Sequence, residues 1–433
     1  MIKDLRDYLA LLENEGWLDR VTTPTELLEV PGIMKQQEKK GRTVLFEQIN
    51  GYQRPLVNNL FGSREFLAKV LGCTREEVPR VFSELYVKHI KPVMVDSGPV
   101  QEVVHRGDQI DIRQYPFIIH NAKDAGRYIT AGMVIAKDPD TGVRNLSFNR
   151  MQIKGPDRTG FRLSPTQDLE AYYKKAEARG QRLEIAAVIG NHPLDLLAAA
   201  CGPPRDVDEL DIAGSLRGEP VELVKCISVD LEVPARAEMV LEGYIIPGEL
   251  EEEGPFGDFM DFYVPVMKNQ IFHITCITCR HDPILQAISA GSVDDVTLLG
   301  TPREAQLYKV IRDLNVDVRG INLALCNNYL SGALSICKQF ENEPRNILMA
   351  AFGSFKFLKN FIIVDHDVDV FDPKDVFWAI STRLRAEQGV SIIPNAMGFG
   401  RDTYGIHSAK MGIDATAPFD CWEEFERVRI PTP

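Results

Sequence analysis

Two acidic side chains flank a short turn rich in glycine and proline, and their spacing suits acid–base chemistry. The stretch reads Glu251-Glu-Glu-Gly-Pro-Phe-Gly-Asp258. Proline fixes φ and glycine supplies the positive-φ positions of tight turns, so a Gly-Pro-x-Gly core does not continue a helix. The turn is therefore predicted to hold Glu253 and Asp258 at the two ends of a rigid bend. Neighbouring carboxyl groups push each other's pKa values apart, which separates a proton donor from an acceptor. Taken alone, the same acidic run is also typical of a solvated loop.

A segment upstream carries an arginine beside two asparagines. Asn145-Leu-Ser-Phe-Asn-Arg150 follows the turn Asp138-Pro-Asp-Thr-Gly142 and has the composition of a strand. Because side chains alternate along a strand, its three odd-numbered residues are predicted on one face and Arg150 on the other. An arginine at a strand end can bind a carboxylate through two parallel hydrogen bonds. The alternative for Arg150 is an ordinary surface salt bridge.

The elements that must position these residues begin with a small α/β segment over residues 1–90. Helical patterns occur at 5–15, 65–71 and 75–85, and a short strand is predicted at 43–47. We see no chemistry in this segment and interpret it as a scaffold.

Residues 91–295 are predicted to form a β domain. Strands are predicted at 100–104, 131–136, 146–153, 183–189, 222–233, 240–246 and 271–278. Two helices interrupt them, one over 165–179, with Ser164 as N-cap and Pro165 as first residue, and one over 194–200. Many strands with few helices favour a barrel or sandwich with an antiparallel core.

The C-terminal third returns to alternating elements. A helix over 301–314, opening with Thr301-Pro302, is interpreted as a linker within residues 296–315. Beyond it, an α/β domain is predicted over 316–433, with strands at 321–325 and 361–364 and helices at 344–351 and 373–384.

Composition narrows the function classes. The 433 residues carry a net charge of −13, which argues against a nucleic-acid partner, because phosphate binding needs a basic face. No apolar run is long enough for a membrane span, and the N-terminus reads as an amphipathic helix rather than a signal peptide. A cytoplasmic protein is the resulting prediction. The single C-x-x-C pair, Cys276 and Cys279, lies in a β-branched strand and is interpreted as buried strand cysteines rather than a zinc site.

Several motifs in order along the chain resemble the UbiD family of prenylated-FMN-dependent decarboxylases. They are Asp124-Ala-Gly-Arg-Tyr-Ile-Thr130, Asn145-x-x-x-x-Arg150, Pro165-Thr-Gln-Asp168, Glu222-Leu-Val-Lys-Cys226, Glu253-Gly-Pro-Phe-Gly-Asp258, Val364-Asp-His-Asp-Val-Asp-Val-Phe-Asp372 and Lys410-Met-Gly-Ile-Asp-Ala-Thr416. The resemblance covers nearly the whole chain. It implies α/β plus β architecture: an N-terminal α/β segment, a central split β-barrel that binds flavin, a linker helix and a C-terminal α/β oligomerisation domain.

The same resemblance implies a catalytic triad of Arg150, Glu253 and Asp258. Asp258 is the predicted proton donor, and a carboxylic acid that donates near neutral pH needs a raised pKa. We predict that Glu253 supplies the like charge for this, while Arg150 keeps Glu253 ionised.

A divalent metal, Mn²⁺ or Mg²⁺, is implied beside the cofactor phosphate, with K⁺ as a further candidate ion. Its ligands map onto Asn145, Asp168 and Glu222, although the family has a histidine where Asp168 stands. An all-oxygen site would suit these hard ions. The alternatives for Asp168 are a lost metal site or a charge that complements the helix dipole.

Cofactor contacts implied by the resemblance come from two neighbouring segments and one distant lysine. They are Phe148, Asn149, Arg150, Arg162, Leu163, Ser164, Gln167, Asp168 and Lys359, with Lys356 as an alternative to Lys359.

The predicted reaction is reversible, non-oxidative decarboxylation of an aromatic, heteroaromatic or α,β-unsaturated acid. A non-catalytic flavin-binding or assembly subunit is the alternative, and a carboxylate-pair hydrolase would leave Arg150 unexplained. Phe259 and the stretches 288–295 and 394–399 are predicted to line or close the substrate pocket. The implied partners are a small aromatic acid, a second copy in a homodimer or homohexamer, and a flavin prenyltransferase that supplies the cofactor.

Overall fold

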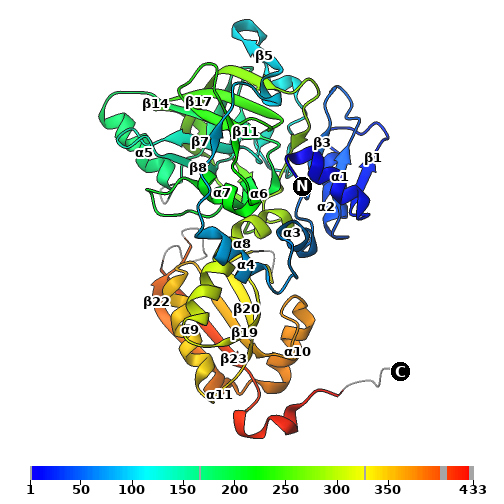
Figure 1. The fold of residues 1–433 in the computed structure, drawn as a ribbon, viewed down its shortest axis with the longest axis vertical. Helices are drawn as coiled ribbons and strands as arrows, with labels where there is room; N and C mark the ends of the chain where they lie inside the picture. Colours follow the sequence, from blue (N-terminus) through cyan, green and yellow to red (C-terminus); the bar gives the residue numbers. More distant parts are fainter. Residues whose placement is uncertain (1, 165–166, 326–327, 400–406, 429–433) are drawn as a thin grey trace. The chain divides into compact units, whose positions relative to one another are not determined.

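The chain folds into two compact units, shown in the computed structural model of Figure 1, which describes residues 2–164, 167–325, 328–399 and 407–428. The first unit comprises residues 1–66 and 85–298, and the second comprises 67–84 and 299–433. Among the described residues, each helix is too short or too polar to span a lipid bilayer.

The N-terminal segment is a small α/β layer, as predicted. Asp4 caps the first helix by accepting hydrogen bonds from the backbone N–H groups of Arg6 and Asp7. Strands β1, β2 and β3 form one sheet, which a strand from far along the sequence, β18 (Leu285–Gln286), completes. The elements of this layer are α1 (Leu5–Asn14), β1 (Leu18–Val21), α2 (Val30–Glu38), β2 (Thr43–Phe46) and β3 (Leu56–Asn58). The helices that follow, α3 (Arg64–Leu71) and α4 (Val78–Tyr86), lie mostly in the second unit.

A nine-stranded antiparallel sheet forms the centre of the first unit (Figure 1). Its path is β6-β9-β10-β17-β14-β11-β7-β8, and β5 pairs with β17. The long strands β14 and β17 run through the middle, and a core of fully buried side chains such as Phe161, Ile185 and Phe272 packs on this sheet. The strands are β5 (Val103–Arg106), β6 (Tyr128–Ile129), β7 (Met133–Lys137), β8 (Arg144–Phe148), β9 (Met151–Ile153), β10 (Arg158–Phe161), β11 (Leu183–Ile189), β14 (Met239–Glu253) and β17 (Met267–Cys279). Cys276 and Cys279 are buried on β17, as predicted.

The single strand predicted over 146–153 is wrong, because the chain leaves the sheet at Asn149 and Arg150. Before this break β8 pairs with β7, and after it β9 pairs with β10 and β6 near the other end of the sheet path. Asn149 and Arg150, between the two strands, do not follow the alternation of side chains along a strand.

Helices and short strands complete the first unit. The helix predicted from residue 165 begins at Asp168 with Gln167 at the N-cap position, so Ser164 is not its cap, and Pro165 lies outside the described residues. Helix α7 and strand β10 were not predicted. The elements are β4 (Val93–Met94), η1 (Pro99–Gln101), η2 (Gly107–Gln109), η3 (Ile112–Gln114), α5 (Asp168–Ala178), α6 (Pro193–Ala199), α7 (Glu209–Arg217), β12 (Glu222–Lys225), β13 (Glu232–Pro234), β15 (Phe256–Gly257) and β16 (Tyr263–Val264).

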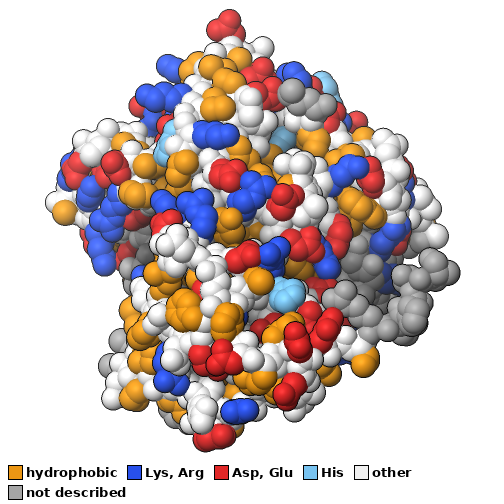
Figure 2. All heavy atoms as spheres, turned by 60° about the horizontal axis from the view of Figure 1, so that its bottom comes forward, with side chains coloured by type: hydrophobic (Ala, Val, Ile, Leu, Met, Phe, Trp, Pro, Cys, Tyr) orange, Lys and Arg blue, Asp and Glu red, His pale blue; other side chains and the backbone are white. Residues whose placement is uncertain are grey.

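The second unit is α/β with a five-stranded mixed sheet of order β19-β20-β21-β23-β22. Strands β20, β21 and β23 are parallel, as expected where helices connect them. Its elements are the C-terminal part of α8 (Val293–Arg312), β19 (Asp317–Asn322), β20 (Ser331–Cys337), α9 (Glu343–Ser354), β21 (Asn360–Asp365), α10 (Pro373–Arg383), α11 (Ala386–Gly389), β22 (Val390–Met397), β23 (His407–Ala415) and η4 (Phe419–Phe425). On the face in Figure 2, acidic and basic side chains are interspersed, so the negative charge does not gather into one field there.

The start predicted for α8 is wrong by eight residues. The helix begins at Val293, and Pro302, which was expected to open it, lies inside. The side chain of Ser292 accepts a hydrogen bond from the backbone N–H of Asp295 and so provides the cap at the true start.

Candidate active site

Arg150 and Glu253 form a two-pronged ion pair at the end of β14. The Nε of Arg150 lies 3.0 Å from Oε1 of Glu253, and its Nη2 lies 2.7 Å from Oε2. Asn269 on β17 donates a third hydrogen bond to the same carboxylate, at 2.8 Å. The side chain of Glu253 is completely buried. A buried carboxylate is tolerated because these three donors replace the water that it loses.

Gly160 leaves space for the side chain of Glu253, and Gln152 holds the turn that follows it. A side chain on Gly160 of β10 would come within 3.2 Å of Cγ of Glu253. After Glu253 the chain bends sharply, and Gln152 accepts a hydrogen bond from the N–H of Gly254 at 3.2 Å. The predicted rigid bend between the two acids is therefore present and is fastened to the sheet.

Two aromatic rings, one of them from the bend itself, pack against the ion pair. Phe256 lies under the guanidinium of Arg150, 4.9 Å from the ring centroid, and its ring is 4.5 Å from that of Tyr128. The hydroxyl of Tyr128 is buried with no hydrogen-bond partner among the described residues. Burial and the nearby Glu253 raise the pKa of Tyr128. Burial also lowers the pKa of His120 to about 4, so this ring near Phe256 is neutral at pH 7.

Asp258 lies at the other end of the bend in different surroundings. Its Oδ1 accepts a hydrogen bond of 3.0 Å from the backbone N–H of Met260, and its side chain is partly buried. Asp124 holds the preceding Gly257 through a 2.9 Å hydrogen bond. Burial and the charge of Asp258 raise the pKa of Asp295, at the start of α8, to about 6. The predicted influence of Glu253 on Asp258 stays a prediction.

The predicted cofactor-contacting residues of the first unit form two adjoining segments. Asn149 joins them, because its Nδ2 donates to the carbonyl of Arg162 at 2.9 Å and to Oε1 of Gln167 at 3.2 Å. Gln167 in turn reaches the carbonyl of Phe148. Leu163 is buried within this contact and Ser164 follows it, partly buried. Lys359 and Lys356 belong to the second unit, so their predicted contact with a flavin phosphate stays a prediction.

Two of the three predicted metal ligands, Asn145 and Asp168, lie on elements that contact each other. Asn145 is on β8, which contacts both α5 and α7. It is buried, and its Nδ2 has no hydrogen-bond partner among the described residues. Asp168 opens α5, where its carboxylate binds the exposed Arg205 at 2.6 Å.

Glu209, which opens α7, is a candidate that the motif search missed. Its carboxylate is buried and accepts a hydrogen bond of 2.9 Å from the N–H of Leu146, next to Asn145. Burial and the charges of Asp208 and Asp168 raise the pKa of Glu209 to about 8. Within the described ranges, no three His, Cys, Asp or Glu side chains converge as a metal cluster, so a site here would also need the amide oxygen of Asn145.

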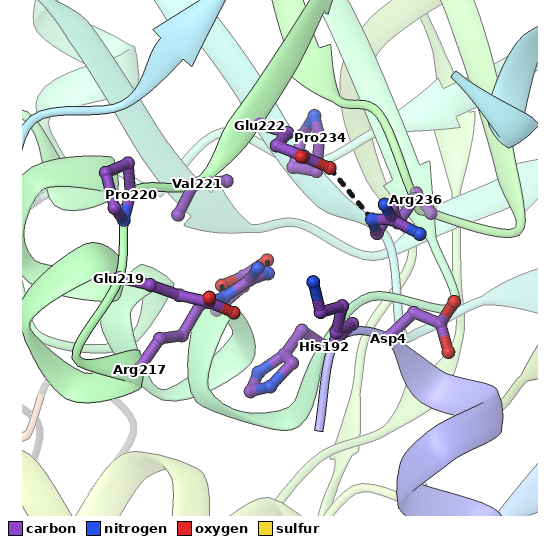
Figure 3. Close-up of a pocket in the computed structure, with 12 residues that line it drawn as sticks. Asp4, His192, Arg217, Glu219, Pro220, Val221, Glu222, Pro234 and Arg236 are labelled. Carbon is purple, nitrogen blue, oxygen red and sulfur yellow. Dashed lines mark hydrogen bonds and ion pairs between the residues drawn. The ribbon is translucent and has the colours of Figure 1, made fainter. Parts of the chain in front are cut away.

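Glu222 has another partner. Its carboxylate binds Arg236 at 2.8 Å, as Figure 3 shows, and it lines a polar pocket together with His192 and Arg217. The pocket has a volume of about 40 Å³, which is enough for about one water molecule and too small for an organic ligand. Glu222 is thus held by an arginine, as Asp168 is, and its role as a metal ligand stays a prediction.

Comparisons with known proteins cover almost the whole chain. Family models for the N-terminal, Rift-related and C-terminal domains of 3-octaprenyl-4-hydroxybenzoate carboxy-lyase match residues 9–86, 91–293 and 296–415. The chain is 34% identical, over 98% of its length and 99% of the relative, to an anhydromevalonate phosphate decarboxylase from Methanothermobacter thermautotrophicus.

Solved structures agree with this assignment. The UbiD-class enzyme HmfF from Pelotomaculum thermopropionicum, in complex with FMN, is 40% identical with a TM-score of 0.94, over 99% of this chain and 97% of that chain. An apo 3,4-dihydroxybenzoic acid decarboxylase from Enterobacter cloacae is 25% identical with a TM-score of 0.94, over 100% and 98%. The chain belongs to the UbiD family of carboxy-lyases, which confirms the predicted family, fold class and enzyme class.

Proposed function

We propose that this protein catalyses the reversible, non-oxidative decarboxylation of an aromatic, heteroaromatic or α,β-unsaturated carboxylic acid with prenylated FMN. The observation that carries the proposal is the buried ion pair of Arg150 and Glu253, joined by a fixed bend to Asp258. Further support comes from similar chains: HmfF was solved with FMN, and its evolved dimeric form, 38% identical to this chain, with prenylated FMN.

The cofactor would lie against the segments that Asn149 joins, residues 148–150 and residues 162–164 with Gln167. When bound, prenylated FMN supplies an electron sink for the pair of electrons that remains when CO₂ leaves. Arg150, held by Glu253, would orient the substrate carboxylate, because a fixed guanidinium presents two parallel donors. The aromatic wall of Phe256 and Tyr128 would exclude water from the reacting carbon. Asp258 would return the proton.

A divalent metal fits best between β8 and the starts of α5 and α7. Asn145, Asp168 and Glu209 offer an all-oxygen donor set, and a cation there would offset the cost of burying the carboxylate of Glu209, which accepts a backbone hydrogen bond from Leu146. Mn²⁺ or Mg²⁺ suits oxygen ligands and would neutralise a cofactor phosphate. Mn²⁺ titration of the purified chain tests the set: Glu209→Gln should weaken binding and Glu222→Gln should not.

The proposed activity is tested with protein co-produced with a flavin prenyltransferase. Bound cofactor is read from visible absorbance, and turnover from CO₂ release and from H/D exchange at the carbon that bears the carboxyl group. Hydroxybenzoic, heteroaromatic and α,β-unsaturated acids form the first panel, since the relatives include decarboxylases named for 3,4-dihydroxybenzoic acid and for anhydromevalonate phosphate. Exchange with one acid that is lost in Asp258→Asn supports the proposal.

Bound cofactor without exchange on any acid would favour the alternative of a flavin-binding assembly subunit. The homodimer or homohexamer implied by the resemblance stays a prediction, which light scattering of the purified protein tests.

A further inference from the structure

A short loop segment, residues 121–125, is hydrogen-bonded to the bend between the two acids of the site. The N–H of Ala125 donates to the carbonyl of Pro255 at 2.9 Å. The Oδ1 of Asp124 accepts a hydrogen bond of 2.9 Å from the N–H of Gly257, a residue 133 positions further along the chain. Two successive residues of the segment therefore bind the backbone of the bend.

Gln152 on β9 joins the same two segments. Its Oε1 accepts a hydrogen bond of 3.2 Å from the N–H of Gly254, and its Nε2 donates to the carbonyl of Ala125 at 3.3 Å. The side chain of Gln152 is buried. The bend is thus bound at both of its glycines, at Gly254 by Gln152 and at Gly257 by the loop segment.

The segment and the bend are packed against each other without a gap. A Cβ built on Gly257 would lie 2.5 Å from Nδ2 of Asn121 and 2.9 Å from its Cγ. Next to it, the N–H of Lys123 donates to the hydroxyl of Tyr263, which pairs with Gly257 across β15 and β16, at 3.2 Å. A shift of the segment would therefore be transmitted directly to the bend.

Stabilisation of its own turn is the competing explanation for Asp124. Its Oδ2 accepts a hydrogen bond of 2.8 Å from the N–H of Asn121, and its N–H donates to the carbonyl of Asn121 at 3.0 Å. One acceptor oxygen would be enough for that turn. A carboxylate presents two acceptor oxygens, whereas an asparagine side chain presents one acceptor and one donor. The second oxygen of Asp124 serves Gly257, so the residue type is explained by the bridge and not by the turn alone.

We propose, on the premise of the proposed function, that Asp124 is a positioning residue that holds Asp258 in place for proton return by binding the N–H of Gly257. This bond fixes the residue before Asp258. The remainder of the turn fixes Asp258 itself, because its N–H donates to the carbonyl of Phe262 at 3.0 Å. Proton transfer needs a donor in the correct place, and a displacement of about 1 Å can lower a rate by roughly 10²-fold.

The test uses the cofactor-loaded full chain with Asp124→Ala and the matched control Asp111→Ala. Asp111 lies in the same loop region and accepts a hydrogen bond of 2.9 Å from the N–H of Arg113 in its own turn. In Asp124→Ala, kcat and the rate of H/D exchange should fall by roughly 10–100-fold, whereas KM and the visible absorbance of the bound cofactor should stay near wild-type values.

Two comparisons separate positioning from a general loss of structure. Asp124→Asn keeps the size of the side chain and one acceptor, so its kcat should lie between those of the wild type and Asp124→Ala. Asp111→Ala should keep the wild-type kcat. A wild-type kcat in Asp124→Ala, or a loss that Asp111→Ala reproduces, overturns the inference.

A second measurement does not depend on turnover. Amide hydrogen exchange resolved to single residues reports the N–H of Gly257 directly. It should exchange about tenfold faster in Asp124→Ala than in the wild type and at the wild-type rate in Asp111→Ala. An unchanged rate at Gly257 in Asp124→Ala overturns the inference. Faster exchange there, together with a wild type that turns over no acid, supports the hold of Asp124 on the bend and rejects the proposed function instead.

Discussion

Glu253 and Asp258 are separated by only four residues, yet the fold gives them opposite surroundings. Glu253 is fully buried and faces three hydrogen-bond donors, two from Arg150 and one from Asn269. Asp258 is partly buried and accepts a hydrogen bond from the N–H of Met260 in its own turn. Three donors replace the water that the buried carboxylate loses, whereas a partly buried carboxyl group keeps part of its contact with solvent. The bend therefore sorts two similar side chains into an anchor and a proposed donor.

The largest effect is expected when Arg150, the cation that pairs with Glu253, is removed. Arg150→Ala leaves the carboxylate of Glu253 buried beside a single amide, which should reduce the free energy of unfolding by about 3–5 kcal/mol. The rate of decarboxylation should fall as well. Urea unfolding measures the loss of stability. Arg158→Ala is the matched control, since the ion pair of Arg158 with Glu251 is only partly buried and should change the free energy of unfolding by less than about 1 kcal/mol.

Substitution of Asp258, the proposed proton donor, should lower the catalytic rate rather than the stability of the protein. Asp258→Asn keeps an oxygen for the N–H of Met260 but removes the transferable proton, so kcat should fall by roughly 10²–10⁴-fold. The melting temperature should stay close to that of the wild type. Turnover of the cofactor-loaded variant with normal kcat would remove Asp258 from the mechanism.

The third donor to Glu253 gives a graded test of the anchor. Asn269→Ala removes one charge-assisted hydrogen bond and leaves the pair with Arg150, so the free energy of unfolding should fall by about 1.5–3 kcal/mol. Thermal unfolding at one pH is sufficient to see it. A loss as large as that of Arg150→Ala would mean that the ion pair is not the dominant contact.

Neutralising Asp295, in the first turn of α8, should have the opposite effect and increase the free energy of unfolding. The pKa of Asp295 is raised from 3.8 to about 6, so between these values the unfolded chain releases the proton first and stability falls as the pH rises. Above about pH 6 the full penalty is present. Asp295→Asn should therefore raise the free energy of unfolding at pH 8 by about 1–3 kcal/mol and have little effect at pH 4. A destabilised variant at pH 8 would indicate that capping of α8 dominates.

Several residues could be placed from the sequence because short-range geometry decides them. The Gly-Pro-Phe-Gly core predicts a bend whatever surrounds it, and the β-branched runs predict β11, β14 and β17. The break at Asn149 and Arg150 could not be predicted, because it depends on β8 and β9 pairing with different partners. Asn269 and Glu209 carry no local signal at all. Each becomes informative only when the sheet or the start of α7 brings it beside a residue far away in the chain.

The sequence by itself determined the family, the bend and the residue types of the ion pair, since these follow from motif order and from the limits that proline and glycine place on φ. Only the tertiary structure decided which acid faces which group. Burial and distance set the electrostatic surroundings of a carboxyl, and both depend on strands and helices that meet across more than a hundred residues, as Arg150 and Glu253 do.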